Sequence, residues 1–190
     1  MKSEKLKEFT GRLEARNDEL KWLYMELYKG QTESYARLCL QMLEFYDGRS
    51  EERKASDRVR EAKPDWYLEN DLIGMMMYTD NFAGNLQGVR KHLDYLEKSH
   101  INYLHLMPLL DTTEGKSDGG YAVSDYRKVL PKLGTMEDLA ELTADCHKRG
   151  ICVCLDYVMN HTSEDHEWAK RARAGEREYQ DRYFFYDDYG

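Results

Sequence analysis

The 190-residue sequence lacks a long apolar segment, an excess of basic residues, and cysteines spaced as in a metal site. No apolar run approaches the roughly 20 residues that span a bilayer, so we expect no membrane partner. The formal net charge of −8 argues against nucleic acid as a partner, because phosphate binding needs a basic surface. The charged N-terminal residues are not followed by the apolar stretch of a secretory signal, which favours a cytoplasmic protein.

The cysteines match neither a zinc site nor a disulfide framework. They are Cys39, Cys146, Cys152 and Cys154. Cys152 and Cys154 fall on one face of a predicted strand, and we expect buried free thiols there. We expect neither a metal nor another cofactor.

Residues 1–65 carry apolar side chains at spacings of three, four and seven, which predicts helices. The apolar positions before Gly30 are Leu6, Phe9, Leu13, Leu20, Leu23 and Leu27. The pattern resumes with Tyr35, Leu38, Met42 and Phe45, and residues 49–63 are mostly charged, as in a solvated helix or a tether. We predict a helical domain at 1–66 that is an appendage packed on a larger domain, and we prefer this to a binding role.

From residue 71 the pattern changes to apolar runs of strand length that alternate with amphipathic helices. The runs predict strands near 71–78, 101–107 and 151–156, with a long loop at 109–134. Buried strands joined by helices pair in parallel, through right-handed crossovers. The fold class is therefore α/β, with three successive strand–helix units of a sheet or barrel.

Polar side chains follow the third predicted strand. Asp156, Asn160 and His161 come directly after it, and the carboxyl ends of barrel strands are where active sites form. The alternative is that Asp156 and Asn160 simply cap a strand and a turn. On this motif alone the two interpretations are about equally supported.

The loop after the second predicted strand favours a binding site. Asp118 and Tyr121 flank two glycines in the segment 117–121, so a carboxylate and an aromatic ring can approach one ligand from the same side. An isolated tyrosine would more often pack back on the sheet. Here the loop shares the predicted rim with Asp156 and His161, which favours a concave site.

At this point the sequence resembles the N-terminal portion of the amylosucrases, within the α-amylase family of glycoside hydrolases. The resemblance extends over essentially the whole chain. It is carried by residues 64–66, 82–86, 103–109, 114–123 and 156–161, in the family's order. The discriminating segment is Glu-Gly-Lys-Ser-Asp-Gly-Gly-Tyr at 114–121, because other α-amylase relatives usually have shorter versions.

The resemblance implies a fold and a set of residue roles. The fold would be an N-terminal helical domain at 1–66, the first three β/α units of a TIM (β/α)8 barrel at 67–161, and at 162–190 the start of the insertion after strand three. Asp118, Tyr121 and His161 would bind the glucosyl unit, whereas Asp156 and Asn160 would organise the site.

The resemblance also implies a retaining mechanism with an Asp nucleophile and a Glu acid/base, contributed by the fourth and fifth strands. Neither is located in this chain, so we expect the 190 residues alone to be inactive on sucrose, and the missing barrel half to be a partner. An open sheet edge would also favour a homo-oligomer or low solubility.

Three functions remain open. The chain is the first part of a glucosyltransferase that uses sucrose, with sucrose or an α-glucan as substrate. Alternatively it belongs to another α-glucosidase or a sucrose hydrolase of the α-amylase family. The third possibility is a truncated, non-catalytic carbohydrate-binding protein.

Overall fold

The computed structural model describes residues 2–186 and divides the chain into two compact units, Met1–Tyr67 and Leu68–Gly190. We call them the first unit and the second unit, and describe each by itself. The predicted domains at 1–66, 67–161 and 162–190 remain predictions.

The first unit is helical over its described residues, as the apolar spacing predicts. Its helices are α1 (Lys2–Glu14), α2 (Asn17–Leu27), α3 (Thr32–Gly48) and α4 (Glu51–Ala62). The charged segment after residue 49 is a helix because Ser50 caps it, accepting a hydrogen bond from the Arg53 backbone N–H, and Glu51 and Glu52 lie in its first turn. A short 3₁₀ helix, η1 (Trp66–Leu68), follows.

The second unit contains the predicted parallel sheet. Its strands are β1 (Gly74–Met77), β2 (Tyr103–Leu106) and β5 (Cys152–Leu155), in the order β1-β2-β5. Both pairings are parallel and in register, with Met77 opposite Leu106 and Leu106 opposite Leu155. The prediction of three parallel strands is confirmed, although each is shorter than its apolar run.

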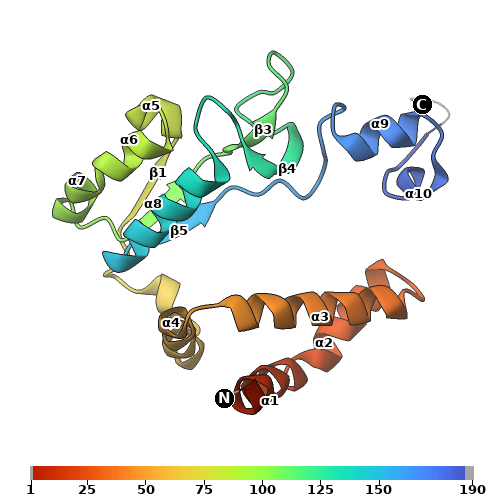
Figure 1. Cartoon of the computed structure of the whole chain (residues 1–190), viewed down its shortest axis with the longest axis horizontal. Helices are drawn as coiled ribbons and strands as arrows, with labels where there is room; N and C mark the ends of the chain where they lie inside the picture. The colour runs from red at the N-terminus through yellow and green to blue at the C-terminus, as the bar shows by residue number, and fades with distance from the viewer. Residues whose placement is uncertain (1, 187–190) are drawn as a thin grey trace. The chain divides into compact units, whose positions relative to one another are not determined.

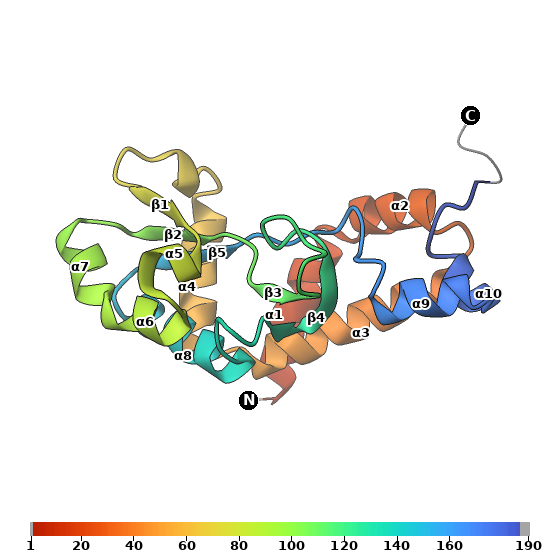
Figure 2. The same cartoon turned by 90° about the horizontal axis from the view of Figure 1, so that it is seen from above.

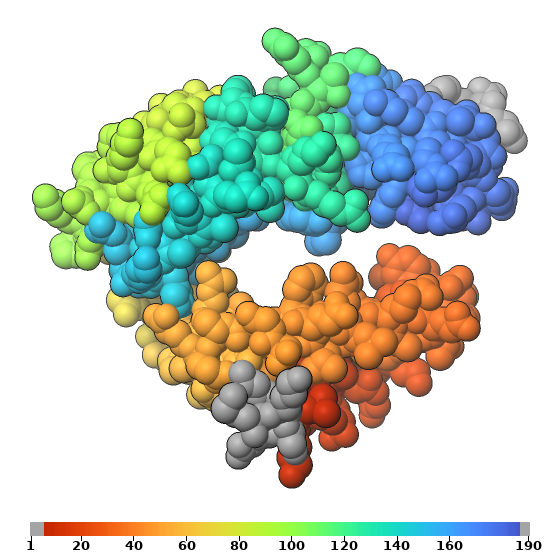
Figure 3. Space-filling view, in the orientation of Figure 1, coloured from red at the N-terminus to blue at the C-terminus, as the bar shows by residue number. Residues whose placement is uncertain are grey.

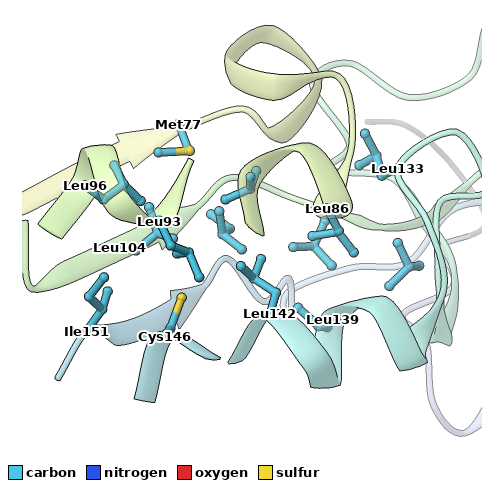
Figure 4. Close-up of a cluster of buried hydrophobic side chains, with 14 of the residues drawn as sticks. Met77, Leu86, Leu93, Leu96, Leu104, Leu133, Leu139, Leu142, Cys146 and Ile151 are labelled. Atoms are coloured by element: carbon cyan, nitrogen blue, oxygen red, sulfur yellow. The ribbon is translucent and has the colours of Figure 1, made fainter. Parts of the chain in front are cut away.

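Helices cover one face of this sheet (Figure 1). The chain passes from β1 through α5 (Thr79–Ala83), α6 (Leu86–Lys91) and α7 (Leu93–Lys98) to β2, and α8 (Met136–Lys148) precedes β5. Thr135 and Asp138 form the expected capping box at the start of α8. Figure 4 shows the resulting core, in which Leu104 of β2 lies among Leu93, Leu96 and Leu142, all almost completely buried.

The other face of the sheet is less covered. It carries Met76, His105 and Cys154, which are register partners, and Met76 is 65% exposed. Cys152 and Cys154 are free and half-buried, so the prediction of buried thiols at these two positions was wrong. The reason is that they point away from the helix-covered face, because alternate residues of a strand face opposite sides.

The segment 109–134 is not simply a loop. It contains an antiparallel pair, β3 (Leu110–Thr112) and β4 (Val123–Val129), with irregular register. After β5 the chain continues into α9 (Glu167–Arg173) and α10 (Arg177–Gln180). Figure 2 shows the β3–β4 pair between the parallel sheet and these last helices, so the pair connects the two ends of the second unit.

Candidate functional site

The site is positioned by the carboxyl ends of β2 and β5. Because these strands are neighbours in register, the residues that follow them emerge side by side. The Asp156 backbone N–H still donates to the Leu106 carbonyl at 3.1 Å, so Asp156 is the last residue held by the sheet. Its half-buried carboxylate is therefore fixed at the rim.

The loop between β3 and β4 crosses this rim because it contains two glycines with positive φ. Gly119 has φ of 60° and Gly120 has φ of 90°. A Cβ atom at Gly120 would lie 2.9 Å from Pro108 Cβ, and one at Gly119 would lie 2.9 Å from the Tyr78 hydroxyl oxygen. Only glycine fits both the backbone conformation and the space. The pair therefore brings Tyr121 over the strand ends, while the preceding part of the loop projects from the surface of the second unit (Figure 3).

Tyr121 and Asp156 are joined directly. The Tyr121 hydroxyl donates to Asp156 Oδ2 at 2.7 Å. This hydrogen bond to the carboxylate, with lesser contributions from burial and the charge of Asp156, raises the pKa of Tyr121 to about 12. Tyr121 therefore stays protonated, and a hydrogen-bond donor and an acceptor lie next to each other.

His161 joins the same cluster from the other side. Its Nε2 lies 3.1 Å from the Tyr121 carbonyl oxygen, and Asn160 Nδ2 lies 3.2 Å from His161 Nδ1. Because a carbonyl only accepts and an amide nitrogen only donates, these partners assign the neutral tautomer with the proton on Nε2. Asn160 thus orients the His161 ring through this contact.

Asp118 is placed differently from the other predicted residues. Its side chain is exposed, and its backbone carbonyl accepts from the Tyr121 N–H at 3.2 Å. Within residues 2–186, no hydrogen bond or ion pair links the Asp118 carboxylate to Asp156, Asn160 or His161. Tyr121, Asp156, Asn160 and His161 are therefore brought together, and Asp118 supports the turn through its backbone.

Sequence reasoning missed three side chains that shape the site. The Tyr126 hydroxyl lies 2.7 Å from the Val158 carbonyl and 2.9 Å from the His161 carbonyl, to one of which it donates, and so fixes the segment after β5. Lys116 forms ion pairs across the site, described below. Tyr78, directly after β1, places its hydroxyl against Gly119, and its position at the end of a predicted strand was the one available signal.

The site is an open rim rather than an enclosed cavity. Tyr121 is 37% exposed, and Asn160 and His161 are also exposed. A hollow of about 620 Å³ lies elsewhere, between α3 and α4 of the first unit, where Phe45, Arg49 and Arg53 line it. The described residues contain no group of three side chains able to hold a metal ion, and no helix among them is long and apolar enough to cross a membrane.

Comparison with known proteins gives one family. The family described as alpha amylase, catalytic domain, matches residues 43–189. An oligo-1,6-glucosidase of a Bacillus species (strain F5) is 38% identical over 105 residues, which are 55% of this chain and 20% of that protein. The trehalose-6-phosphate hydrolase of Bacillus subtilis is 40% identical over 94 residues, 50% of this chain and 16% of that enzyme.

The solved structures that are similar to this chain include an enzyme of the same kind as a relative found by sequence. A trehalose-6-phosphate hydrolase of Bacillus licheniformis superimposes with a TM-score of 0.58 at 32% identity, over 64% of this chain and 23% of that one. The trehalulose synthase of Pseudomonas mesoacidophila gives 0.57 at 35% identity, over 63% and 22%. A mutant of that synthase in complex with its substrate sucrose gives 0.56 at 35% identity, over 64% and 22%. The chain thus spans about a fifth of the length of the relatives it matches.

Proposed function

Because the chain belongs to the α-amylase catalytic-domain family, whose fold is a TIM barrel, we propose that it supplies the glucosyl-binding part of a sucrose-using α-glucosyltransferase of the amylosucrase kind. The observation that carries the proposal is the cluster of Tyr121, Asp156 and His161 at the carboxyl ends of adjacent parallel strands. In barrels of this class, that end holds the active site.

The chemistry of the cluster suits a pyranose. A tyrosine ring offers an apolar face to the ring carbons of a sugar, and the Asp156 carboxylate and the His161 N–H accept and donate hydrogen bonds at hydroxyl groups. In the sugar-free structure these groups satisfy one another. A bound glucosyl unit would exchange those hydrogen bonds for its own, so polar groups would not be left unpaired.

The reaction would be glucosyl transfer with retention. Such a mechanism needs an Asp or Glu nucleophile and a separate acid/base. We assign neither to this chain: in the proposal both come from later strands of the barrel, as the resemblance to amylosucrases implies. Asp156 would then serve binding and organisation, consistent with its direct hydrogen bond to Tyr121.

The main alternative is another α-glucoside-cleaving enzyme of the same family. Its support is the function of the relatives, which include an oligo-1,6-glucosidase and two trehalose-6-phosphate hydrolases. Sucrose is favoured by the 114–121 segment and by the likeness to a trehalulose synthase solved with sucrose. A carbohydrate-binding protein without catalysis is the third possibility, and it would use the same rim.

The test is to titrate the chain with sucrose, trehalose and isomaltose and to measure the affinity for each sugar by nuclear magnetic resonance. We expect sucrose to bind most tightly and Tyr121→Ala to weaken it roughly tenfold, the loss that accompanies about 1.4 kcal/mol of binding free energy. Tyr95→Ala is the matched control, because Tyr95 is 55% exposed on α7, away from the rim. Tighter binding of trehalose or isomaltose than of sucrose would favour the alternative enzyme.

A further inference from the structure

Two arms of chain form the candidate site. The first, residues 113–122, carries Asp118 and Tyr121 after β3, and the second, residues 156–166, carries Asp156 and His161 after β5. The first arm braces itself: the Lys116 N–H donates to the Thr113 carbonyl at 3.1 Å, and the Ala122 N–H donates to Ser117 Oγ at 2.9 Å. These local bonds hold its shape but do not connect it to the second arm.

The site residues themselves also connect the arms. The bond from Tyr121 to Asp156 and the contact of His161 with the Tyr121 carbonyl use the groups that would bind sugar hydroxyls. A ligand that takes those hydrogen bonds would therefore release the arms from each other. A site that stays assembled around its ligand needs a tie whose atoms do not contact the sugar.

Lys116 provides such a tie. Its Nζ lies 2.7 Å from Glu164 Oε1 and 3.0 Å from Asp165 Oδ2, both on the second arm. The ammonium group holds the pKa of both carboxyls below their usual values. The two acidic residues are also held from α9, since Arg173 lies 3.3 Å from Glu164 Oε2 and Lys170 lies 3.7 Å from Asp165 Oδ1. The second arm thus presents to Lys116 a pair of carboxylates that α9 already holds in place.

Charge makes this lysine difficult to replace. Lys116 is the one basic residue between positions 109 and 126, where Asp111, Glu114, Asp118 and Asp125 are acidic. Without the ammonium group, the first arm would offer no cation to Glu164 and Asp165, which would keep only Arg173 and Lys170 of α9. Lys116→Ala therefore removes the electrostatic attraction between the two arms.

We propose that Lys116 is a positioning residue that clamps the two arms of the α-glucoside site, so that Tyr121 stays next to Asp156 and His161 when sugar is bound. Its relevance to sugar rests on the proposed function. The clamp itself does not, because the ion pairs of Lys116 with Glu164 and Asp165 join the arms directly. Lys116 is 47% exposed, and it acts through the loop and not through the reacting atoms.

The first measurement is amide hydrogen exchange without ligand, at Tyr121, Ala122 and Ser163. The Ser163 N–H donates to the Val123 carbonyl at 2.9 Å and reports on the junction of the arms. We expect Lys116→Ala to speed exchange at these three amides at least threefold, and Lys116→Arg to restore protection. Lys148→Ala is the control: Lys148 is exposed and pairs with Asp145 at 3.0 Å within α8, so the variant loses the same charge elsewhere.

The second measurement is sucrose binding at low and at high salt. Salt screens the attraction in the wild-type chain, so raising the ionic strength should weaken sucrose binding by the wild type more than binding by Lys116→Ala. A purely structural defect would leave the salt dependence of the variant equal to that of the wild type. Glu164→Gln removes the Lys116–Glu164 ion pair from the side of the second arm. It should weaken sucrose binding less than Lys116→Ala does, because Asp165 still pairs with Lys116.

The outcomes separate this inference from the proposed function. Faster exchange in Lys116→Ala together with no sucrose binding by the wild type would overturn the proposed function and leave the clamp supported. Unchanged exchange at Tyr121, Ala122 and Ser163 in both Lys116→Ala and Glu164→Gln would overturn the clamp, whether or not sucrose binds. Circular dichroism establishes that each variant is folded before either result is used.

Discussion

The two units of this chain are stabilised in different ways. Among the described residues of the first unit the buried apolar ones are Tyr35 and Tyr46, and many large apolar side chains are exposed, including Trp22, Leu27 and Phe45. In the described residues of the second unit, the strands β1 to β4, the helices α6 to α8 and the loops between them share one cluster of sixteen buried side chains. The difference indicates that the first unit depends on local helix formation, and the second unit on tertiary packing.

Charge follows the same division. The fourteen basic and fourteen acidic residues of Met1–Tyr67 balance, so the whole formal charge of −8 lies in Leu68–Gly190. In the first unit, the ion pair Arg58–Glu8 at 2.9 Å joins α4 to α1, and Arg49–Asp57 joins the end of α3 to α4. In the second unit the acidic excess includes Asp118 and Asp156, which supply hydrogen-bond acceptors at the rim.

The largest effect should come from the core of the second unit. Leu142→Ala removes a completely buried side chain from α8, and we expect a loss of about 2–5 kcal/mol in the free energy of unfolding. Leu40→Ala in α3 is the counterpart in the first unit, and because Leu40 is 61% exposed we expect a change within about 0.5 kcal/mol. Urea unfolding followed by circular dichroism measures both. Equal losses would show that the units do not differ in this way.

The second effect concerns the loop that brings Tyr121 to the rim. Gly120→Ala should cost roughly 1–3 kcal/mol, because its φ is 90° and its Cβ would lie 3.1 Å from the Pro108 carbonyl oxygen. Gly115→Ala is the matched control, with φ of 73° and open space around the added Cβ, and should cost about 1 kcal/mol. Thermal unfolding gives the comparison. If the Gly115 variant were as unstable as the Gly120 variant, the positive φ alone would determine the loss of stability, and the approach to Pro108 would not contribute.

The sequence predicts the parallel sheet better than the segment between its strands. The runs that contain β1, β2 and β5 are continuous and apolar, so the sequence directly predicts that they are buried parallel strands. By contrast β4 mixes exposed Arg127 and Lys128 with buried ends, and such a strand has no alternating pattern. The break between α1 and α2 at residues 15–16 has no Gly or Pro signal either.

The same distinction applies to the site. Tyr121 and Asp156 could be predicted to lie together, because residues after neighbouring parallel strands share one edge. Tyr126 and Lys116 could not, since their partners lie 32 to 49 positions away and depend on how the β3–β4 pair packs. Their roles follow from tertiary geometry, on which a local sequence pattern carries no information.

The third effect depends on pH and belongs to the second unit. His166 is buried, and its Nδ1 accepts the Trp168 N–H at 3.1 Å at the start of α9. Burial lowers the pKa of His166 more than the nearby Asp125 and Glu167 raise it, and Arg127 and Arg182 lower it further. The unfolded chain takes up this proton near pH 6.5, before the folded chain does, so the stabilisation is complete above about pH 6.5 and is lost as the pH falls below it.

His166→Asn tests this, because asparagine keeps a cap acceptor without a titrating ring. We expect the unfolding temperature of the variant to fall less between pH 7 and pH 5 than that of the wild type. His100→Asn is the control: His100 is exposed, and asparagine tolerates its φ of 57°. If the two variants changed the pH profile equally, the effect would belong to histidine removal in general and not to burial at α9.

The smallest effect should come from the one charged side chain that is fully buried in the described residues of the first unit. Lys54 is 1% exposed, its Nζ lies 3.6 Å from Glu51 Oε1, and it sits 4.5 Å above the Tyr46 ring. An ion pair at this distance returns little of the cost of removing an ammonium group from water, and an apolar replacement of similar volume is often neutral or stabilising. We therefore expect Lys54→Met to change the free energy of unfolding by no more than about 1 kcal/mol, toward greater stability. Arg53→Met, on the same helix but partly exposed, controls for helix propensity. A loss above about 2 kcal/mol in Lys54→Met alone would show that the first unit, like the second, depends on its buried contacts, and would remove the contrast between them.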